Sequence, residues 1–136
     1  MAVRVVRLDP AQCDAIWDHV ADGFRLSCKS TGDFLSPAWL RQQCVTGLAA
    51  MFAADDGGTF KGACVVQLQD TPGGTVGRFL GMMGADVNSW KDEMRAVVTQ
   101  WAKSHGAKWL VDDGRPGIKR IVPDAEVVSV TYRIAI

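Results

Sequence analysis

Apolar residues recur at two different spacings along this chain, and each change of spacing marks a new element. The short β-branched run from Val3 to Leu8 predicts a strand. A helix start follows. Asp9 suits the N-cap, Pro10 the first helical position, and Gln12 the third helical position of a capping box. Three- and four-residue spacing after them predicts an amphipathic helix. Its apolar stripe is Cys13, Ile16, Trp17, Val20, Ala21 and Phe24.

The next segment, Arg25 to Ser36, is polar and irregular, and we interpret it as a loop. Ser36 and Pro37 repeat the cap-and-proline signal, so a second helix is predicted to begin there. Its apolar stripe is Leu40, Cys44, Val45 and Leu48.

Three strand-like runs follow, at Ala50–Ala54, Phe60–Gln69 and Thr75–Met83. Glycine-containing turns separate them, which predicts an antiparallel meander. The acidic pair Asp55-Asp56 directly precedes two glycines, so we interpret it as a solvated hairpin tip rather than a metal or acid–base site.

The strongest helix signal begins near Ser89, which is predicted to cap a helix with Asp92 at its third position. His105 and Gly106 are predicted to end this helix, with the glycine in the left-handed position beyond it. The apolar stripe between these ends is Trp90, Met94, Val97, Val98 and Trp101.

The C-terminal part predicts a buried strand at Ala107–Asp112, a brief helix at Ile118–Val122 and a last strand at Glu126–Ile136. The resulting order, β-α-α-β-β-β-α-β-α-β, is mixed α/β, with an α+β mixed sheet. It implies an antiparallel meander whose last strand enters a helical crossover to a parallel neighbour. With 136 residues, we expect a single domain over 1–136.

Composition excludes some classes of function. Hydrophobic residues make up 48% of the chain and charged residues 22%, the balance of a soluble globular protein. Fifteen basic and fifteen acidic residues give no net charge, so nothing electrostatic points to nucleic acid as a partner. We find neither an apolar run long enough to span a membrane nor a secretory signal, and we expect a cytoplasmic protein.

The four cysteines lie far apart, with no C-x-x-C pair and no histidine at ligand spacing. We therefore predict no metal site and interpret the thiols as reduced, with Cys13, Cys44 and Cys64 on apolar faces.

A resemblance enters near the C-terminus. Two short patterns occur there. The first is W-A-x-x-x-G-A, formed by Trp101, Ala102, Gly106 and Ala107, and the second is G-R-x-G-x-x-R, formed by Gly114, Arg115, Gly117 and Arg120. With the element order, this resembles the GNAT family of acyl-CoA-dependent N-acyltransferases, and the closest likeness is to small phage-encoded members. The resemblance implies a GNAT-like fold, with acetyl-CoA as the coenzyme of any enzyme of this kind.

Members of that family that work as enzymes hold the coenzyme pyrophosphate on a Q/R-x-x-G-x-G/A loop. The corresponding stretch here, Met83 to Ser89, has one glycine and places Asp86 where an anion would approach. We interpret this loop as degenerate, so no cofactor is firmly indicated. What the resemblance leaves is a pantetheine-type contact along the strand and at the helix start, through Phe79, Leu80, Met82, Gly84 and Ser89. An open groove beside them favours ligand binding, and a filled one favours scaffolding.

Candidate catalytic groups are few. The family often uses a tyrosine as general acid, which makes Tyr132 a candidate, but its place on an apolar strand face favours a core role. His19 and His105 have no evident nucleophile or orienting partner. Asp112 and Asp113 end a strand, where ligands meet α/β sheets, and their position suits a cap of the following turn equally well.

Two functional hypotheses follow from the resemblance. The first is a non-catalytic structural or assembly component of a phage virion, in the host cytoplasm or the virion, that binds protein partners. Its contacts would be Trp39, which lies beside the second helix stripe, and the basic residues Arg115 and Arg120. The alternative is an acetyl-CoA-dependent N-acetyltransferase acting on an amine.

Overall fold

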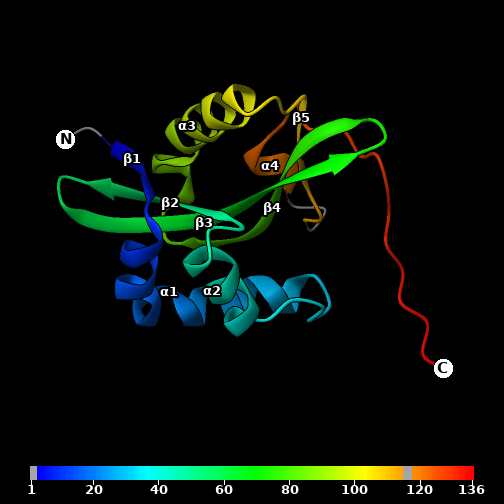
Figure 1. Ribbon diagram of the computed structural model, residues 1–136, viewed down its shortest axis with the longest axis horizontal. Helices are drawn as coiled ribbons and strands as arrows, with labels where there is room; N and C mark the ends of the chain where they lie inside the picture. Colours follow the sequence, from blue (N-terminus) through cyan, green and yellow to red (C-terminus); the bar gives the residue numbers. More distant parts are fainter. Residues whose placement is uncertain (1–2, 115–117) are drawn as a thin grey trace.

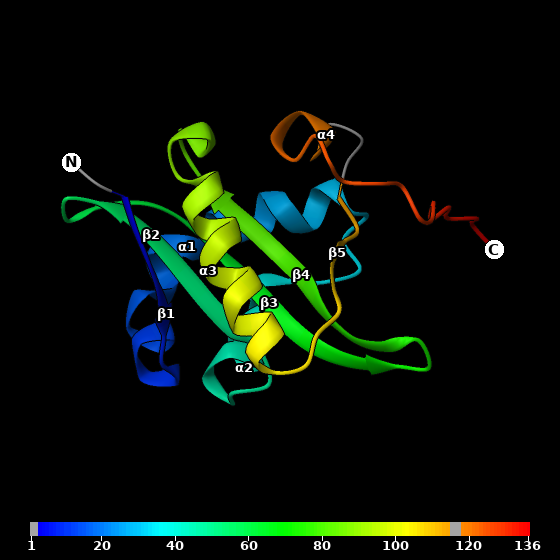
Figure 2. The same ribbon diagram turned by 90° about the horizontal axis from the view of Figure 1, so that it is seen from above.

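In the computed structural model, which describes residues 3–114 and 118–136, one sheet separates two layers of helices (Figure 1). The strands are β1 (Val3–Leu8), β2 (Ala50–Asp56), β3 (Thr59–Thr71), β4 (Gly74–Gly84) and β5 (Trp109–Asp112). The helices are α1 (Pro10–Ser30), α2 (Pro37–Val45), α3 (Lys91–Ser104) and α4 (Ile118–Ile121), with a 3-10 turn η1 (Val87–Ser89) before α3. Helices α1 and α2 cover one face of the sheet, and α3 crosses the other (Figure 2).

The five strands lie in the sheet in the order in which they occur in the chain. β1 to β4 pair antiparallel, and β5 pairs parallel to β4 after the chain has crossed through α3. The predicted fold class, a meander followed by a helical crossover, is confirmed.

The predicted start of α1 is also confirmed, while its end was placed too early. The Gln12 N–H donates to Asp9 Oδ1 at 2.8 Å, and the Asp9 N–H donates to Gln12 Oε1 at 2.9 Å, which closes the capping box. The helix then continues through the expected loop to Ser30, because Cys28 lies one turn beyond Phe24 and is buried with it.

Two predictions at helix ends are wrong. Helix α2 ends at Val45, so Leu48 lies outside it and is exposed. Ser89 belongs to η1, where its Oγ donates to the Asp86 carbonyl at 2.7 Å, and α3 begins at Lys91 without a side-chain cap. Gly106, with φ +84°, ends α3 in the predicted left-handed conformation.

Each face of the sheet has its own apolar core. The core under α1 and α2 includes Trp17, Phe24, Leu40 and Met51, and the core under α3 includes Phe52, Val66, Trp90, Met94 and Val98. All four cysteines are buried and reduced, which agrees with their interpretation as core residues.

The predicted last strand is not formed. Glu126 to Ile136 has no regular structure and leaves the body as an extended segment (Figure 1). Its alternation of apolar residues satisfies the local requirement for a strand, but a strand also needs a paired edge, which this segment does not have in the described structure. None of the helices in the described ranges is long and apolar enough to cross a membrane.

Candidate active site

The sheet opens where β4 outruns β5. The four residues of β5 pair with Val76 to Phe79, and β4 then continues to Gly84 with no strand on that side among the described residues. A register shift against β3 occurs at the same place, because Val65 faces Gly81 and Val66 faces Phe79, which leaves Leu80 as the extra residue. The backbone from Leu80 to Gly84 is therefore an open strand edge beginning at a bulge.

The open edge is lined by half-buried side chains from both cores. Phe79 and Met82 pack against the α3 core, and Leu80 and Met83 pack against the α1 and α2 core. The Met82 N–H donates to Ser27 Oγ of α1 at 3.2 Å. Ser27 thus accepts a hydrogen bond from one backbone donor of the edge. The sequence pattern predicted a loop at this serine, so its role was missed.

The turn that leads from β4 into α3 is built around Trp90. Its ring is 1% exposed, and its Nε1–H donates to the Ala85 carbonyl at 2.9 Å. Gly84, with φ +141°, lies so close to Lys61 and Gly62 that a side chain there would strike the β3 backbone. This glycine therefore serves the packing of β3, β4 and Trp90.

The charges at the start of α3 do not suit a pyrophosphate. The first-turn N–H groups have no side-chain cap, so they remain available as donors. Asp92 and Glu93 lie in that first turn, and Asp86 precedes it in a left-handed conformation. The Lys91 ammonium is engaged by the Ile121 carbonyl at 3.2 Å. Three carboxylates therefore oppose an anion at this point, and one donor of the Lys91 ammonium is already used by a carbonyl.

Asp112 is a titratable group at the start of the opening. It ends β5 opposite Phe79, the last paired residue before the bulge. Desolvation of the carboxyl raises its pKa, Asp113 raises it further, and Arg78 opposes the shift. The residue as a whole is exposed to solvent. Its Oδ2 atom lies close to Gly114, since a Cβ atom added to that glycine would be 3.0 Å from Oδ2. Asp112 thus combines access to solvent with a raised affinity for a proton.

Asp113 has a different environment. Arg78 donates through Nη1 to Asp113 Oδ2 at 3.0 Å and through Nε to Gln69 Oε1 at 2.8 Å. Asp112 is the last residue of β5, and Asp113 lies just beyond it. The adjacent carboxyls differ within the described residues, where Asp113 is paired with Arg78 and no ion pair of Asp112 is found.

The other predicted site residues do not join this opening. Tyr132 lies in the extended C-terminal segment with 84% of its surface exposed, so neither its predicted core position nor a place at the sheet is observed. Trp39 is half-buried against the α1 and α2 core. Arg120 is exposed on α4, and Arg115 lies outside the described residues.

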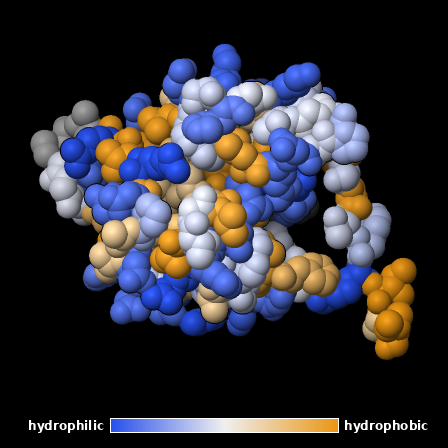
Figure 3. Space-filling view, viewed as in Figure 1, coloured by the Kyte–Doolittle hydropathy of each residue, from blue (hydrophilic) through white to orange (hydrophobic). Residues whose placement is uncertain are grey.

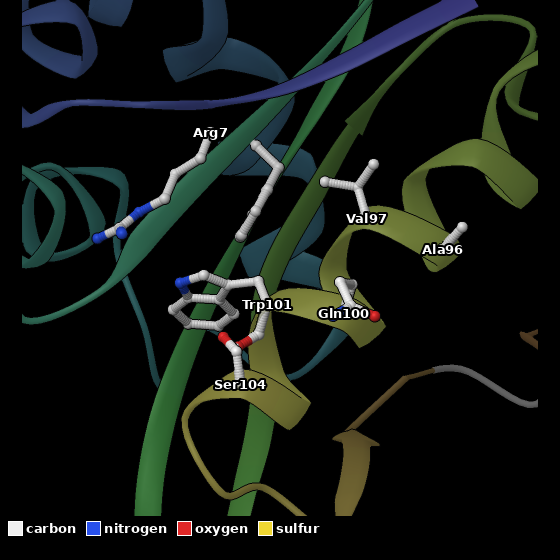
Figure 4. Close-up of a pocket in the computed structure, with 7 residues that line it drawn as sticks. Arg7, Ala96, Val97, Gln100, Trp101 and Ser104 are labelled. Atoms are coloured by element: carbon white, nitrogen blue, oxygen red, sulfur yellow. The ribbon is translucent and has the colours of Figure 1, made fainter.

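A separate hollow of about 430 Å³ lies between β1, β2 and the C-terminal half of α3 (Figure 4). Arg7 lies over the Trp101 ring, 5.7 Å from its centroid, and Phe52 and Val97 form the apolar wall. Among the described residues, no carboxylate or thiol lines this hollow. It offers an apolar surface with one cation, and it lacks the groups that acid–base chemistry needs.

Comparisons with known proteins bear on the fold. No protein-family model matches the chain, and no curated protein matches it by sequence. Among solved structures, it is similar to a ribosomal-protein-alanine N-acetyltransferase from Brucella melitensis biovar Abortus 2308, at 12% identity and TM-score 0.65, over 98% of this chain and 100% of that one. A predicted acetyltransferase from Clostridium acetobutylicum, solved with acetyl-CoA, has 11% identity and TM-score 0.64, over 98% and 96%.

An aminoglycoside acetyltransferase from an uncultured soil metagenomic sample, solved with sisomicin, has TM-score 0.69 at 9% identity, over 98% of this chain and 96% of that one. A GCN5-related N-acetyltransferase from Ralstonia eutropha JMP134 has TM-score 0.66 at 13% identity, over 99% of both chains. The protein therefore has the GNAT fold, and at these identities the comparisons show the fold alone.

These comparisons correct the first functional hypothesis. We expected a non-catalytic virion component, whereas the structures just described are acetyltransferases. Nothing in the comparisons supports a particular likeness to phage proteins. The degenerate phosphate loop had carried the non-catalytic interpretation, but that loop is only one part of the opening between β4 and β5.

Proposed function

We propose that the protein is an N-acetyltransferase that takes an acetyl group from acetyl-CoA and transfers it to an amine. The observation that carries the proposal is the open, bulged edge of β4 beside the end of β5, in a fold shared with acetyltransferases. Acetyl-CoA supplies an acetyl thioester, whose C–S bond breaks as the new amide bond forms.

The residues present fit one part of the coenzyme better than the other. An extended chain that carries amide groups can pair with an open strand edge, as an added strand does, and Leu80 to Gly84 offer such an edge. The phosphates would meet the carboxylates of Asp86, Asp92 and Glu93. We therefore propose that the acyl-pantetheine arm provides most of the binding energy.

Asp112 is proposed as the general base. An amine loses a proton as its nitrogen forms the amide bond, and the Asp112 carboxylate, at the end of β5, accepts it. Its raised pKa makes it a better proton acceptor than an ordinary aspartate. Arg78 keeps Asp113 in an ion pair, which leaves the proton-accepting role to Asp112.

The first prediction concerns ligand size. S-acetyl-pantetheine is expected to bind within roughly tenfold of acetyl-CoA, since the turn before α3 gains little from phosphates. Titration calorimetry with both ligands measures the difference. No heat with acetyl-CoA at roughly millimolar concentration would contradict the proposed function, and a loss of more than about a hundredfold on removing the phosphates would contradict only the division of binding energy.

A second prediction tests the location. Ser27→Phe is expected to abolish acetyl-CoA binding, because the ring would lie against the open edge at Met82. Ser30→Phe, one turn later on the exposed side of α1, is expected to bind like the wild type. Calorimetry gives the affinities, and thermal unfolding shows whether both variants are folded. Equal affinities in two folded variants would place the ligand elsewhere.

A further inference from the structure

The hollow between β1, β2 and the C-terminal half of α3 has no part in the proposed acetyl transfer. Its volume of about 430 Å³ is within the range of small-molecule sites. A second hollow of about 210 Å³ shares Arg7 and Trp101 with it and adds His105. Figure 3 shows apolar surface among polar side chains on the side of the molecule where β1 and α3 lie. The two hollows therefore meet at Arg7 and Trp101.

Arg7 occupies a strand position that would suit an apolar side chain. It is paired across the strands with Phe52, and successive residues of a strand alternate between the two faces of the sheet. Val5, two residues earlier, is buried in the core under α3, so Arg7 projects on that same face. The guanidinium carbon lies 5.7 Å from the centroid of the Trp101 ring. A cation is thus placed directly beside an apolar core.

This cation has no anionic partner in the part of the chain that the structure describes. The five ion pairs found there all use other arginines. No carboxylate from those residues lines either hollow. A guanidinium presents its N–H donors in a plane, which matches the two oxygens of a carboxylate. The charge that complements the hollow is therefore a single anion.

Trp101 adds a second polar group without a partner. Its Nε1 is buried and has no hydrogen-bond acceptor among the described residues. Contacts with Phe52 and His105 hold the ring, at 5.3 and 5.2 Å between ring centroids. In Figure 4 the ring nitrogen is on the side toward which the Arg7 side chain extends. Because buried donors without an acceptor are uncommon, an oxygen held by Arg7 on that side would be a suitable partner for Nε1.

The rest of the larger hollow is mainly apolar. Phe52, Ala96 and Val97 contribute its apolar wall, and Gln100 and Ser104 are its remaining polar residues (Figure 4). Ser104 Oγ already donates to the Trp101 carbonyl at 2.7 Å. A strongly hydrated ion would gain nothing from such a wall, and a neutral apolar compound would leave the guanidinium unpaired.

We propose that this hollow binds a small carboxylate with an apolar body, such as an arylalkanoate. The carboxylate pairs with Arg7, and the apolar body lies on Val97 and the Trp101 ring. Trp101 is near the end of α3, roughly 16 Å along the helix from the turn at Trp90 at about 1.5 Å per residue. The site is therefore separate from the β4 edge, and the proposal does not depend on acetyl transfer.

The third prediction uses phenylacetate as the probe. In NMR spectra, phenylacetate is expected to move the indole N–H signal of Trp101, which Trp101→Phe identifies among the five tryptophans. Phenylacetamide keeps the body without the charge, and acetate keeps the charge without the body. Each is expected to bind at least about tenfold more weakly. A Trp101 signal unmoved at about 10 mM phenylacetate, or equal affinity of either analogue, would overturn the proposal.

Arginine variants then locate the charge. Arg7→Met keeps an apolar side chain of similar length and is expected to weaken phenylacetate binding at least about tenfold. Arg4→Met removes the same charge from the same strand, but Arg4 lies on the other face beside Asp55, so this variant is expected to bind like the wild type. Thermal unfolding shows whether both variants are folded. Equal affinities in the two folded variants would exclude Arg7 as the anion-binding group and overturn the proposal.

Ser27→Phe separates this site from the proposed acetyl-CoA site. The substitution lies at the β4 edge, beside Met82, and is expected to leave phenylacetate binding unchanged. Loss of phenylacetate binding in the folded Ser27→Phe variant would place the carboxylate at the β4 edge instead of the hollow. Failure of acetyl-CoA to bind the wild type would contradict the proposed function and leave the carboxylate site standing.

Discussion

Truncating Trp90 to alanine is expected to lower the free energy of unfolding by about 3–5 kcal/mol. The ring is buried between the core under α3 and the hairpin of β3 and β4. A Cβ built at Gly62 would lie only 2.5 Å from Trp90 Cζ2, so the strands leave no slack around the ring. The change also leaves the Ala85 carbonyl without its donor.

Urea unfolding at neutral pH measures this effect. Leu26→Ala is the control, because Leu26 is an apolar residue exposed on α1 and its truncation is expected to change stability by less than about 0.5 kcal/mol. If Trp90→Ala and Leu26→Ala unfold at similar denaturant concentrations, the turn before α3 is not organised by the Trp90 ring. Acetyl-CoA binding at the β4 edge would then need another structural support.

The parts of the fold that local chemistry determines were predictable from the sequence. Asp9 and Gln12 close a capping box within one turn, and Gly106 ends α3 because glycine adopts positive φ readily. Two predictions were wrong for a common reason, namely that Leu48 lies on the apolar stripe of the second helix and that Glu126–Ile136 forms a strand. Periodicity shows which face of an element can be buried, whereas burial also requires a neighbour that covers it.

The candidate site shows the same division. Gly84 and Ser89 were predicted at the coenzyme from their position in the chain, which stays a prediction, and the structure adds that both take part in the turn around Trp90. Ser27 had no signal in the sequence, because its contact with Met82 depends on α1 crossing β4. The position of Asp112 and Asp113 at the end of a strand pointed to a ligand site. Which of the two is held in an ion pair could not be predicted, because it depends on Arg78 of another strand.

Asp112→Asn is expected to lower kcat by about 10²–10⁴-fold, the usual contribution of a general base. The Asp112→Asn variant is expected to fold. Because the pKa of Asp112 is raised on folding, the ionised carboxylate opposes folding at neutral pH. An uncharged asparagine removes that opposition, and its stabilising effect should diminish as the pH falls through the pKa of Asp112. Loss of activity with equal or higher stability separates catalysis from folding.

The pH dependence of kcat/KM provides the matched control. Activity should fall on the acid side as Asp112 becomes protonated, at a pH above that of an ordinary aspartate because its pKa is raised. Asp113→Asn removes a negative neighbour of Asp112 and releases the Arg78 guanidinium from its ion pair. Each of these two effects lowers the pKa of Asp112, so the acid limb should move to lower pH while kcat at neutral pH is kept. Release of free thiol from acetyl-CoA, with an amine as acceptor, follows both variants. An Asp112→Asn enzyme that turns over at the wild-type rate, or an acid limb that does not move in Asp113→Asn, would remove Asp112 from the reaction and leave the acceptor proton to solvent.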